Sequence, residues 1–202
     1  MIAIVNHGAG NIGSVANAIA TLGYETKITD RPKDVLGSRV VILPGVGAAG
    51  DAMKRLNETG MAEAVRKIME ENRPLFAVCL GLQLLFSNTE ENGFHSCLDV
   101  IKGTVKRLPQ TVKVPHMGWN QVKQRIHHRI FQGIPDGANF YFVHSYYAEP
   151  FDKSLIAATT EYGVTFCSML IKGNLVATQF HPEKSGKWGL KMYQNFLEVA
   201  SS

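Results

Sequence analysis

The sequence is poor in cysteine and has no long apolar run. Its three cysteines, Cys79, Cys97 and Cys167, are an odd number at wide spacing, and no CxxC pair occurs. Because no secretory leader is recognisable either, we expect reduced thiols in a cytoplasmic protein rather than a disulfide framework. No apolar stretch approaches the roughly 20 residues that a membrane-spanning helix needs, so we expect no membrane association.

Metal-binding spacings are also missing. His127 and His128 are adjacent and therefore point in different directions, and neither H-x-x-x-H nor H-E-x-x-H occurs. We expect no metal and no cofactor. Three other histidines, His7, His116 and His144, are near polar residues and fit either a site or an interface, and their spacing does not decide between the two.

The composition is that of an ordinary globular protein, with 45% hydrophobic and 19% charged residues. A chain of 202 residues can bury roughly 70% of its unfolded surface, so we expect residues 1–202 to form a single domain. The net charge is +4, and 123–129 is the one basic cluster. It lacks an aromatic platform and any recognised binding motif, which favours a solvated loop over a nucleic-acid contact.

Apolar runs alternate with helical patterns in the first half of the chain. The expected strands are 2–5, 24–29, 39–43 and 74–79, and the expected helices are 14–24, 31–36, two up to residue 71, and 81–88. The second half has β-rich segments, 100–108, 139–150 and 154–180, before a last helix at 186–200. This order predicts an α/β fold whose mostly parallel central sheet is flanked by helices and has an antiparallel extension.

Two stretches fit the pattern G-x-G-x-x-G, "GAGNIG" at 8–13 and "GVGAAG" at 45–50. The first follows the opening strand, begins a helix and is followed by Asp30, which is the layout of a dinucleotide-binding turn. A nicotinamide-dependent oxidoreductase is therefore an alternative function. However, a tight turn from strand to helix needs glycine whatever it binds, and the chain is short for a dehydrogenase.

A cysteine marks the junction between the fourth apolar run and its helix, in "PLFAVCLGLQLLF" at 74–86. A sharp turn of this kind exposes a nucleophile, and crowding requires small residues two positions before and after it, here Ala77 and Gly81. The start of the following helix favours thiolate over thiol. Cys79 is therefore the predicted nucleophile, whereas Cys97 and Cys167 are expected to be buried and inert.

A base for this cysteine follows the last β-rich segment. In "HPEKSG", His181 and Glu183 are two residues apart and can share one face at the carboxyl end of a strand, with Pro182 stiffening the pair. Glu183 could accept a hydrogen bond from one ring nitrogen while the other faces the thiol. Because sites in such sheets collect at the carboxyl ends of the strands, we predict a Cys79, His181, Glu183 triad.

These motifs resemble a known family. "AVCLGLQLLF" and "FHPEKS" are similar to the nucleophile turn and the His/Glu pair of class I glutamine amidotransferases, and "LPGVGAAGDAM" is similar to their oxyanion-hole loop. "GAGNIGSVANAI", "VPHMGWN" and "FYFVHSYY" resemble the branch that forms the glutaminase subunit of imidazole glycerol phosphate synthase. The resemblance implies a flavodoxin-like fold. Ala77 departs from the usual glycine of the family.

The resemblance also implies a reaction and its residues. Glutamine would be hydrolysed to glutamate and ammonia through a γ-glutamyl thioester on Cys79, with His181 transferring protons. The family's pattern assigns the oxyanion hole to the backbone of Leu80, Val46 and Gly47. It assigns glutamine binding to Gln83, Glu91, Ser145 and Tyr146.

The implied partner is a separate (β/α)8-barrel cyclase subunit, which uses the ammonia to close an imidazole ring. The two subunits would form a heterodimer in histidine biosynthesis. The residues that resemble the family's partner-facing positions are Asn11, Ser14, Trp119, Tyr141 and Lys184. A binding module that keeps the fold without catalysis is the third possible function.

Overall fold

The computed structural model describes residues 1–8 and 11–201. Its strands are β1 (Ile2–Val5), β2 (Thr26–Thr29), β3 (Val40–Leu43), β4 (Leu75–Val78), β5 (Phe86–Thr89), β6 (His95–Ser96), β7 (Ile101–Arg107), β8 (His116–Gln124), β9 (Ala138–His144), β10 (Tyr146–Pro150), β11 (Ile156–Glu161), β12 (Thr165–Lys172) and β13 (Leu175–Thr178). The α-helices are α1 (Ile12–Thr21), α2 (Pro32–Leu36), α3 (Ala49–Glu58), α4 (Met61–Glu70), α5 (Leu80–Leu84) and α6 (Gly186–Ser201). Three 3-10 turns are η1 (Arg129–Phe131), η2 (Lys153–Leu155) and η3 (Pro182–Lys184).

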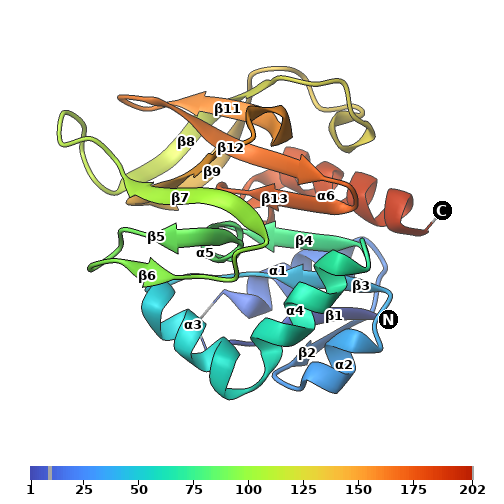
Figure 1. Ribbon diagram of the computed structural model, residues 1–202. Helices are drawn as coiled ribbons and strands as arrows, with labels where there is room; N and C mark the ends of the chain where they lie inside the picture. The colour runs from blue at the N-terminus through green and yellow to red at the C-terminus, as the bar shows by residue number, and fades with distance from the viewer. Residues whose placement is uncertain (9–10, 202) are drawn as a thin grey trace.

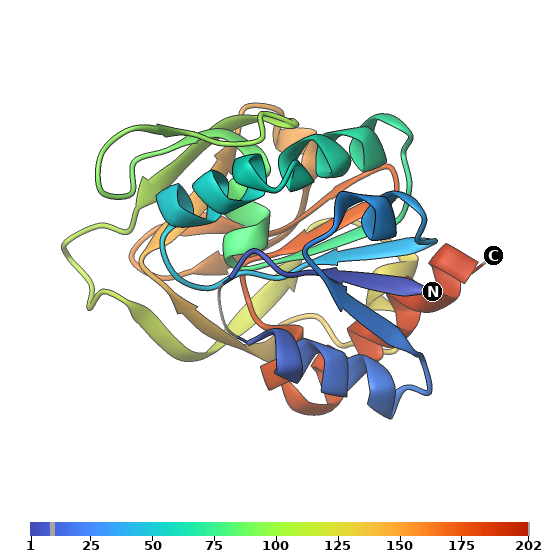
Figure 2. The same ribbon diagram turned by 90° about the horizontal axis from the view of Figure 1, so that it is seen from below.

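The central part of the sheet is parallel, with the order β2-β1-β3-β4-β13. This is the flavodoxin-like order. Figures 1 and 2 show α2, α3 and α4 on one face of these strands and α1 and α6 on the other. Because both faces are covered, every residue of β1, β3, β4 and β13 is buried, which is why their sequences are continuous apolar runs.

The sheet continues beyond β13 through strands of the second half, in the order β12-β10-β7-β5-β6. The pairs β13/β12, β12/β10 and β10/β7 are antiparallel, whereas β7 and β5 run parallel. β11 pairs with both β12 and β8, and β8 forms a long antiparallel ladder with β9. The predicted α/β fold with a parallel core and an antiparallel extension is therefore confirmed (Figure 1).

The predicted helix at 81–88 is wrong in its second half. The helix α5 ends at Leu84, and the strand β5 begins at Phe86. Phe86 is fully buried and pairs with Ile101 of β7, so tertiary packing overrides the helical pattern of this segment. The prediction also missed β8, because its outward positions Met117 and Trp119 are apolar and hide the usual alternation.

The carboxyl ends of the parallel strands meet at one edge of the sheet. Residues 44–47 follow β3, Cys79 follows β4, and His181 comes shortly after β13. Gly81 allows α5 to lie against the end of β3, because a Cβ there would stand 2.0 Å from the carbonyl oxygen of Leu43. The loop after β3 is thereby brought against the turn that carries Cys79.

A similar close approach occurs between α6 and the turn η3, at Gly189, and we expect it to contribute to the stability of the fold. A Cβ at Gly189 would stand 1.8 Å from the carbonyl oxygen of Pro182, so Gly189→Ala must displace the helix or the turn. We expect the free energy of unfolding, measured with urea, to fall by about 2 kcal/mol. Gly13→Ala in α1 is the control, since its Cβ meets nothing within 4 Å and alanine favours helix. Equal stability of the two variants would contradict the packing argument.

Candidate active site

Cys79 occupies a strained turn between β4 and α5. Its φ of +53° is unusual for a residue with a side chain, and the residue is only 6% exposed. The thiol donates to the carbonyl oxygen of Val143 at 3.8 Å, and the side-chain amide of Gln179 donates to the sulfur at 3.5 Å. The geometry is that of a nucleophile presented at the end of a strand.

The electrostatic support for Cys79 differs from the sequence-based argument. The helix that follows it, α5, has only five residues. Its dipole therefore stabilises a thiolate less than the dipole of the longer helix expected from the sequence would. The cationic group near the thiol is the imidazole of His181, whose pKa responds to the charge of Cys79.

His181 and Glu183 form a buried hydrogen-bonded pair. Nδ1 of His181 donates to Oε1 of Glu183 at 2.7 Å, and the two side chains are 1% and 0% exposed. Burial lowers the pKa of His181, but attraction to Cys79 and to Glu183 outweighs burial and raises the pKa to about 10. Nε2 is buried without a hydrogen-bond partner among the described residues, so it is left for a proton exchanged with the thiol or a substrate.

The pair lies on a turn and not on a strand as expected. The strand β13 ends at Thr178, whose hydroxyl donates to the carbonyl oxygen of Phe180 at 3.0 Å. His181 then precedes the 3-10 turn η3, which begins with Pro182. The turn, and not strand alternation, brings the His181 ring and the Glu183 carboxylate together.

Two further side chains hold the carboxylate of Glu183. The side-chain amide of Asn11, at the start of α1, donates to Oε1, and the hydroxyl of Tyr193 in α6 donates to Oε2 at 3.5 Å. Asn11 was expected at a partner interface, yet its side chain contacts Glu183. The sequence analysis missed this contact, as well as those of Tyr193 and Gln179, because no local pattern signals contacts so distant along the chain.

A cavity of about 400 Å³ opens beside Cys79. The sequence-predicted residues on its lining are Val46, Gly47, Cys79, Leu80, Gln83, Glu91, Ser145, Tyr146 and Lys184, and the residues not predicted there are Pro115, Val143 and His144. Eight residues assigned to the nucleophile, the oxyanion hole and glutamine binding thus surround one space, together with Lys184 from the proposed partner face.

Of the three predicted oxyanion donors on the cavity lining, Leu80 already has a partner for its N–H. The backbone N–H of Leu80 donates to the carbonyl oxygen of Gly45 at 3.3 Å. Gly47, with φ of +96°, forms the turn of the same loop. An oxyanion at Cys79 would have to take the place of the Gly45 carbonyl before Leu80 could stabilise it.

The two side chains assigned to glutamine binding already have protein partners. The amide nitrogen of Gln83 donates to the carbonyl oxygen of Tyr146 at 2.9 Å and to the side-chain oxygen of Gln179 at 3.0 Å. Oε2 of Glu91 accepts from the backbone N–H of Ala49 at 2.5 Å, at the start of α3. Gln83 therefore braces the cavity, and Glu91 leaves an acidic group on its lining.

Aromatic side chains gather on the outer face of β8 and β9. Trp119 is 58% exposed and faces Tyr141 across the ladder, with ring centroids 6.1 Å apart. Nζ of Lys184 lies 5.8 Å from the Tyr141 ring centroid. Met117, 63% exposed, is the next outward residue of β8 and was not predicted. Ser14 is exposed on α1, which contacts η3.

Comparison with known proteins agrees with this arrangement. Residues 3–200 match the family glutamine amidotransferase class-I. The chain is 57% identical to the imidazole glycerol phosphate synthase subunit HisH of Dehalococcoides mccartyi, over 99% of this chain and 98% of that one. It is 50% identical to the HisH subunit of Moorella thermoacetica, over 98% and 94%. The chain belongs to the class I glutamine amidotransferases, in the branch of the HisH subunits.

Solved structures of other proteins have the same fold. A structure described as glutamine amidotransferase superimposes with a TM-score of 0.78 at 21% identity and covers 100% of both chains. PurLQS from Thermotoga maritima gives a TM-score of 0.75 at 16% identity, over 98% and 97% of the two chains. At these identities the likeness shows the fold alone.

The nicotinamide alternative has no support in this glutamine amidotransferase. Part of its motif, residues 9 and 10, lies outside the described residues. Asp30, the expected ribose ligand, forms a surface ion pair with Arg55 at 3.8 Å. Asn11, the fourth residue of the motif, contacts Glu183 and so belongs to the surroundings of the triad.

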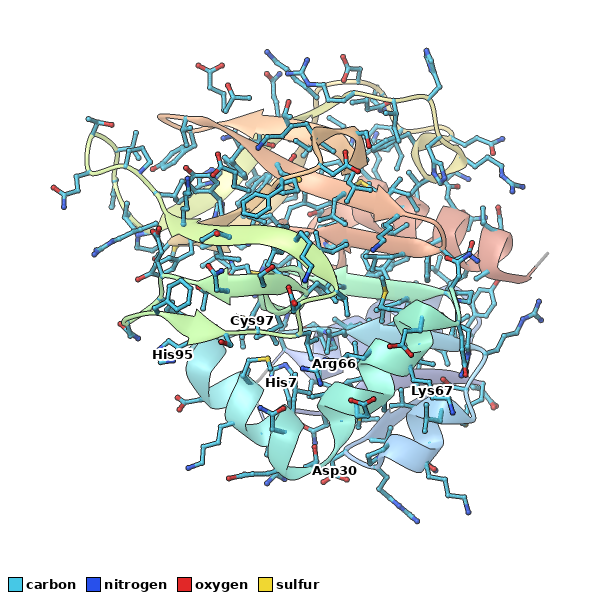
Figure 3. The ribbon with its side chains drawn as sticks, in the orientation of Figure 1. His7, Asp30, Arg66, Lys67, His95 and Cys97 are labelled. Carbon is cyan, nitrogen blue, oxygen red and sulfur yellow. The ribbon has the colours of Figure 1, made fainter. Side chains whose placement is uncertain are left out.

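The other two cysteines of the amidotransferase are buried. Burial raises the pKa of Cys97 to about 11 and that of Cys167 to about 12, so both remain thiols. Cys97 follows β6 and lies close to α3, in the apolar cluster on that face of the sheet (Figure 3). In the described part of the chain, no group of three His, Cys, Asp or Glu could hold a metal ion, and no helix combines the length and apolarity needed to cross a membrane.

Glu183→Gln tests the electrostatics of the triad. The substitution keeps an acceptor but removes the negative charge, so the pKa of His181 should fall from about 10, as burial is then opposed by Cys79 alone. NMR titration of the ring gives this pKa directly. We expect kcat/KM for glutamine to fall on the order of 10²-fold to 10⁴-fold. Glu161→Gln, at an exposed position, is the control, and an unchanged His181 pKa in Glu183→Gln would refute the pairing.

Proposed function

We propose that this chain hydrolyses glutamine to glutamate and ammonia with Cys79, His181 and Glu183. The observation that carries the proposal is the strained turn that places Cys79 on the lining of the cavity, together with the buried, hydrogen-bonded pair of His181 and Glu183 that interacts with this cysteine. Membership of the class I glutamine amidotransferases supports the same reaction. We further propose that residues 1–202 work as one amidotransferase domain.

The reaction begins when the Cys79 thiolate attacks the side-chain amide carbon of glutamine. The tetrahedral intermediate collapses as Nε2 of the His181 imidazolium gives its proton to the departing nitrogen, and ammonia leaves a γ-glutamyl thioester. Water then attacks the thioester while His181 takes its proton. Glutamate departs and the thiolate is restored, with Glu183 holding the Nδ1–H tautomer throughout.

Binding and oxyanion stabilisation are assigned to the cavity. The Glu91 carboxylate is suited to bind the ammonium group of glutamine. The backbone around Ser145 and Tyr146 is proposed to line the same pocket beside the bound glutamine. The oxyanion requires the N–H of Leu80 and one from the Val46–Gly47 segment. The N–H of Leu80 donates to the carbonyl oxygen of Gly45. We therefore propose that the peptide of Gly45, in the loop after β3, rotates away from Leu80 before the oxyanion hole is complete.

The ammonia needs an acceptor enzyme, since ammonia released into neutral water is protonated and stops being a nucleophile. The matched relatives are named as subunits of imidazole glycerol phosphate synthase, which implies a partner subunit. We propose a cytoplasmic heterodimer with the (β/α)8-barrel cyclase subunit in histidine biosynthesis. The proposed contact face is the outer side of β8 and β9 with its neighbours, formed by Ser14, Met117, Trp119, Tyr141 and Lys184.

Cys79→Ala, assayed with the cyclase subunit, tests the reaction. Glutamine-dependent ring closure should be lost, because no thioester can form. Ring closure supported by added ammonium salt should stay near the wild-type rate, since the cyclase site is untouched. Cys97→Ala serves as the matched control and should retain both activities. Loss of both activities in Cys79→Ala would mean that the cysteine serves assembly, and retention of both would refute its role as the nucleophile.

Trp119→Ala tests the contact face. An aromatic side chain at the centre of an interface typically contributes about 2 kcal/mol or more, so we expect the dissociation constant for the cyclase subunit to rise about 30-fold, measured by calorimetry. Phe151→Ala is the control, since it removes an aromatic ring that is 70% exposed and lies outside this face. If both variants bind like the wild type, the partner docks elsewhere.

A further inference from the structure

Two buried histidines that take no part in the proposed chemistry lie beside the cavity. His116 is the first residue of β8 and His144 the last of β9, and the two face each other in the ladder. They are 3% and 6% exposed, and His144 lies on the cavity lining. Buried imidazoles cost stability unless their nitrogens are satisfied, so their hydrogen bonds indicate why they are there.

The hydrogen bonds of the two rings run in one direction. Nδ1 of His144 lies 2.8 Å from the carbonyl oxygen of Tyr146, which can only accept, so this nitrogen carries the proton. In a neutral ring Nε2 must then accept, and it does so from Nδ1 of His116 at 3.0 Å. Nε2 of His116 in turn accepts from the side-chain amide of Asn120 at 3.2 Å. We call this chain, Asn120 to His116 to His144 to the Tyr146 carbonyl, the histidine relay.

The surroundings keep both rings neutral. Burial lowers the pKa of His116 to about 4 and that of His144 to about 3, the latter with a further contribution from the charges of His116 and His181. The His116 ring stacks between Phe142 and Tyr162, with centroids 4.9 Å and 3.9 Å away. A neutral His116 that donates from Nδ1 therefore supports the tautomer that the Tyr146 carbonyl requires of His144.

The relay ends on the part of the cavity that faces Cys79. The carbonyl oxygen of Tyr146 accepts hydrogen bonds from Nδ1 of His144 and from the side-chain amide of Gln83. The carbonyl oxygen of Val143 accepts from the Cys79 thiol. The segment 143–146 therefore receives hydrogen bonds from Gln83 and Cys79, and the bond from His144 to Tyr146 fixes its own conformation. If His144 took the other tautomer, its Nδ1 lone pair would face the Tyr146 oxygen and repel it.

We propose that His116 and His144 are positioning residues for glutamine, which fix the cavity segment 143–146 by a relay of hydrogen bonds between neutral rings. The inference rests on the proposed glutaminase function for its substrate. His116 acts without touching the substrate: it donates to Nε2 of His144 and so supports the tautomer in which Nδ1 of His144 holds the Tyr146 carbonyl. A ring that served packing alone would need only its stacking neighbours.

A pair of substitutions at His116 separates the two roles. His116→Phe keeps a flat ring between Phe142 and Tyr162 but removes the donor to His144. His116→Asn loses the stacking but keeps an N–H close to the place of Nδ1. With the cyclase subunit present, we expect His116→Phe to raise KM for glutamine about tenfold while kcat changes less than about twofold, the loss of roughly one hydrogen bond. His116→Asn should raise KM less, and the exposed His127→Phe should change nothing.

A purely structural role gives a different pattern. His116→Phe would then behave like the wild type, whereas His116→Asn would lower the unfolding temperature and the apparent kcat at unchanged KM. NMR of the ring nitrogens adds a readout independent of turnover: His144 should carry its proton on Nδ1 in the wild type, and its Nε2 signal should shift in His116→Phe, because that nitrogen loses its hydrogen-bond donor. An unchanged Nε2 signal would overturn the relay.

Binding measured without turnover separates this inference from the proposed function. In a Cys79→Ala background with the cyclase subunit, glutamine affinity by calorimetry should fall about tenfold on adding His116→Phe. If the wild type releases no glutamate but this affinity difference holds, the relay stands and the glutaminase function fails. If the wild type is active and the affinities are equal, the relay fails and the function stands. If glutamine does not bind, both are refuted.

Discussion

A positive charge on His181, buried where neither ring nor carboxylate reaches water, is the constraint around which the rest of the site is arranged. A buried charge is tolerated only when it is paired and hydrogen-bonded. Glu183 supplies the pair, and Asn11 from α1 and Tyr193 from α6 hold both oxygens of its carboxylate. Two helices on the same face of the sheet are thereby tied to the turn after β13, which explains why α6 approaches η3 so closely at Gly189.

The opposite side of the site depends on small residues. A Cβ at Gly45 would stand 2.8 Å from the Cβ of Leu80, and one at Gly81 would meet the end of β3. Without side chains at these two positions, the loop after β3 can contact the cysteine turn through its backbone. The contact has a chemical consequence, because the Leu80 N–H that an oxyanion needs is the group that binds this loop. The Gly45 carbonyl and the oxyanion of the reaction therefore compete for the same donor, the N–H of Leu80.

The sequence predicts what local patterns encode. Continuous apolar runs identify β1, β3, β4 and β13. The small residues around Cys79 and the spacing in "HPE" point to Cys79, His181 and Glu183, and the fold places His181 and Glu183 in hydrogen-bond contact. It does not predict β8, where exposed Met117 and Trp119 invert the usual alternation, or β5, whose strand conformation depends on pairing with β7. The contacts of Asn11 with Glu183 and of Gln179 with Cys79 join residues that are 172 and 100 positions apart. No periodicity of 2 or 3.6 residues reports such contacts.

The histidines His181 and His144 show how neighbouring charges decide the charge of a buried ring. Both rings are buried, both use Nδ1 as a donor, and the charge of His181 contributes to the lowered pKa of His144. The Nδ1 acceptor is a carboxylate for His181 and a backbone carbonyl for His144. Attraction to Cys79 and Glu183 raises the pKa of His181 to about 10, whereas burial lowers that of His144 to about 3. Two adjacent imidazolium ions would repel each other, so the ring without a carboxylate stays neutral. A neutral ring has a donor and an acceptor, and only such a ring can pass a hydrogen bond from His116 to the Tyr146 carbonyl. The positive charge with which His181 transfers protons thus also helps to keep His144 neutral, and a neutral His144 can hold the Tyr146 carbonyl in place.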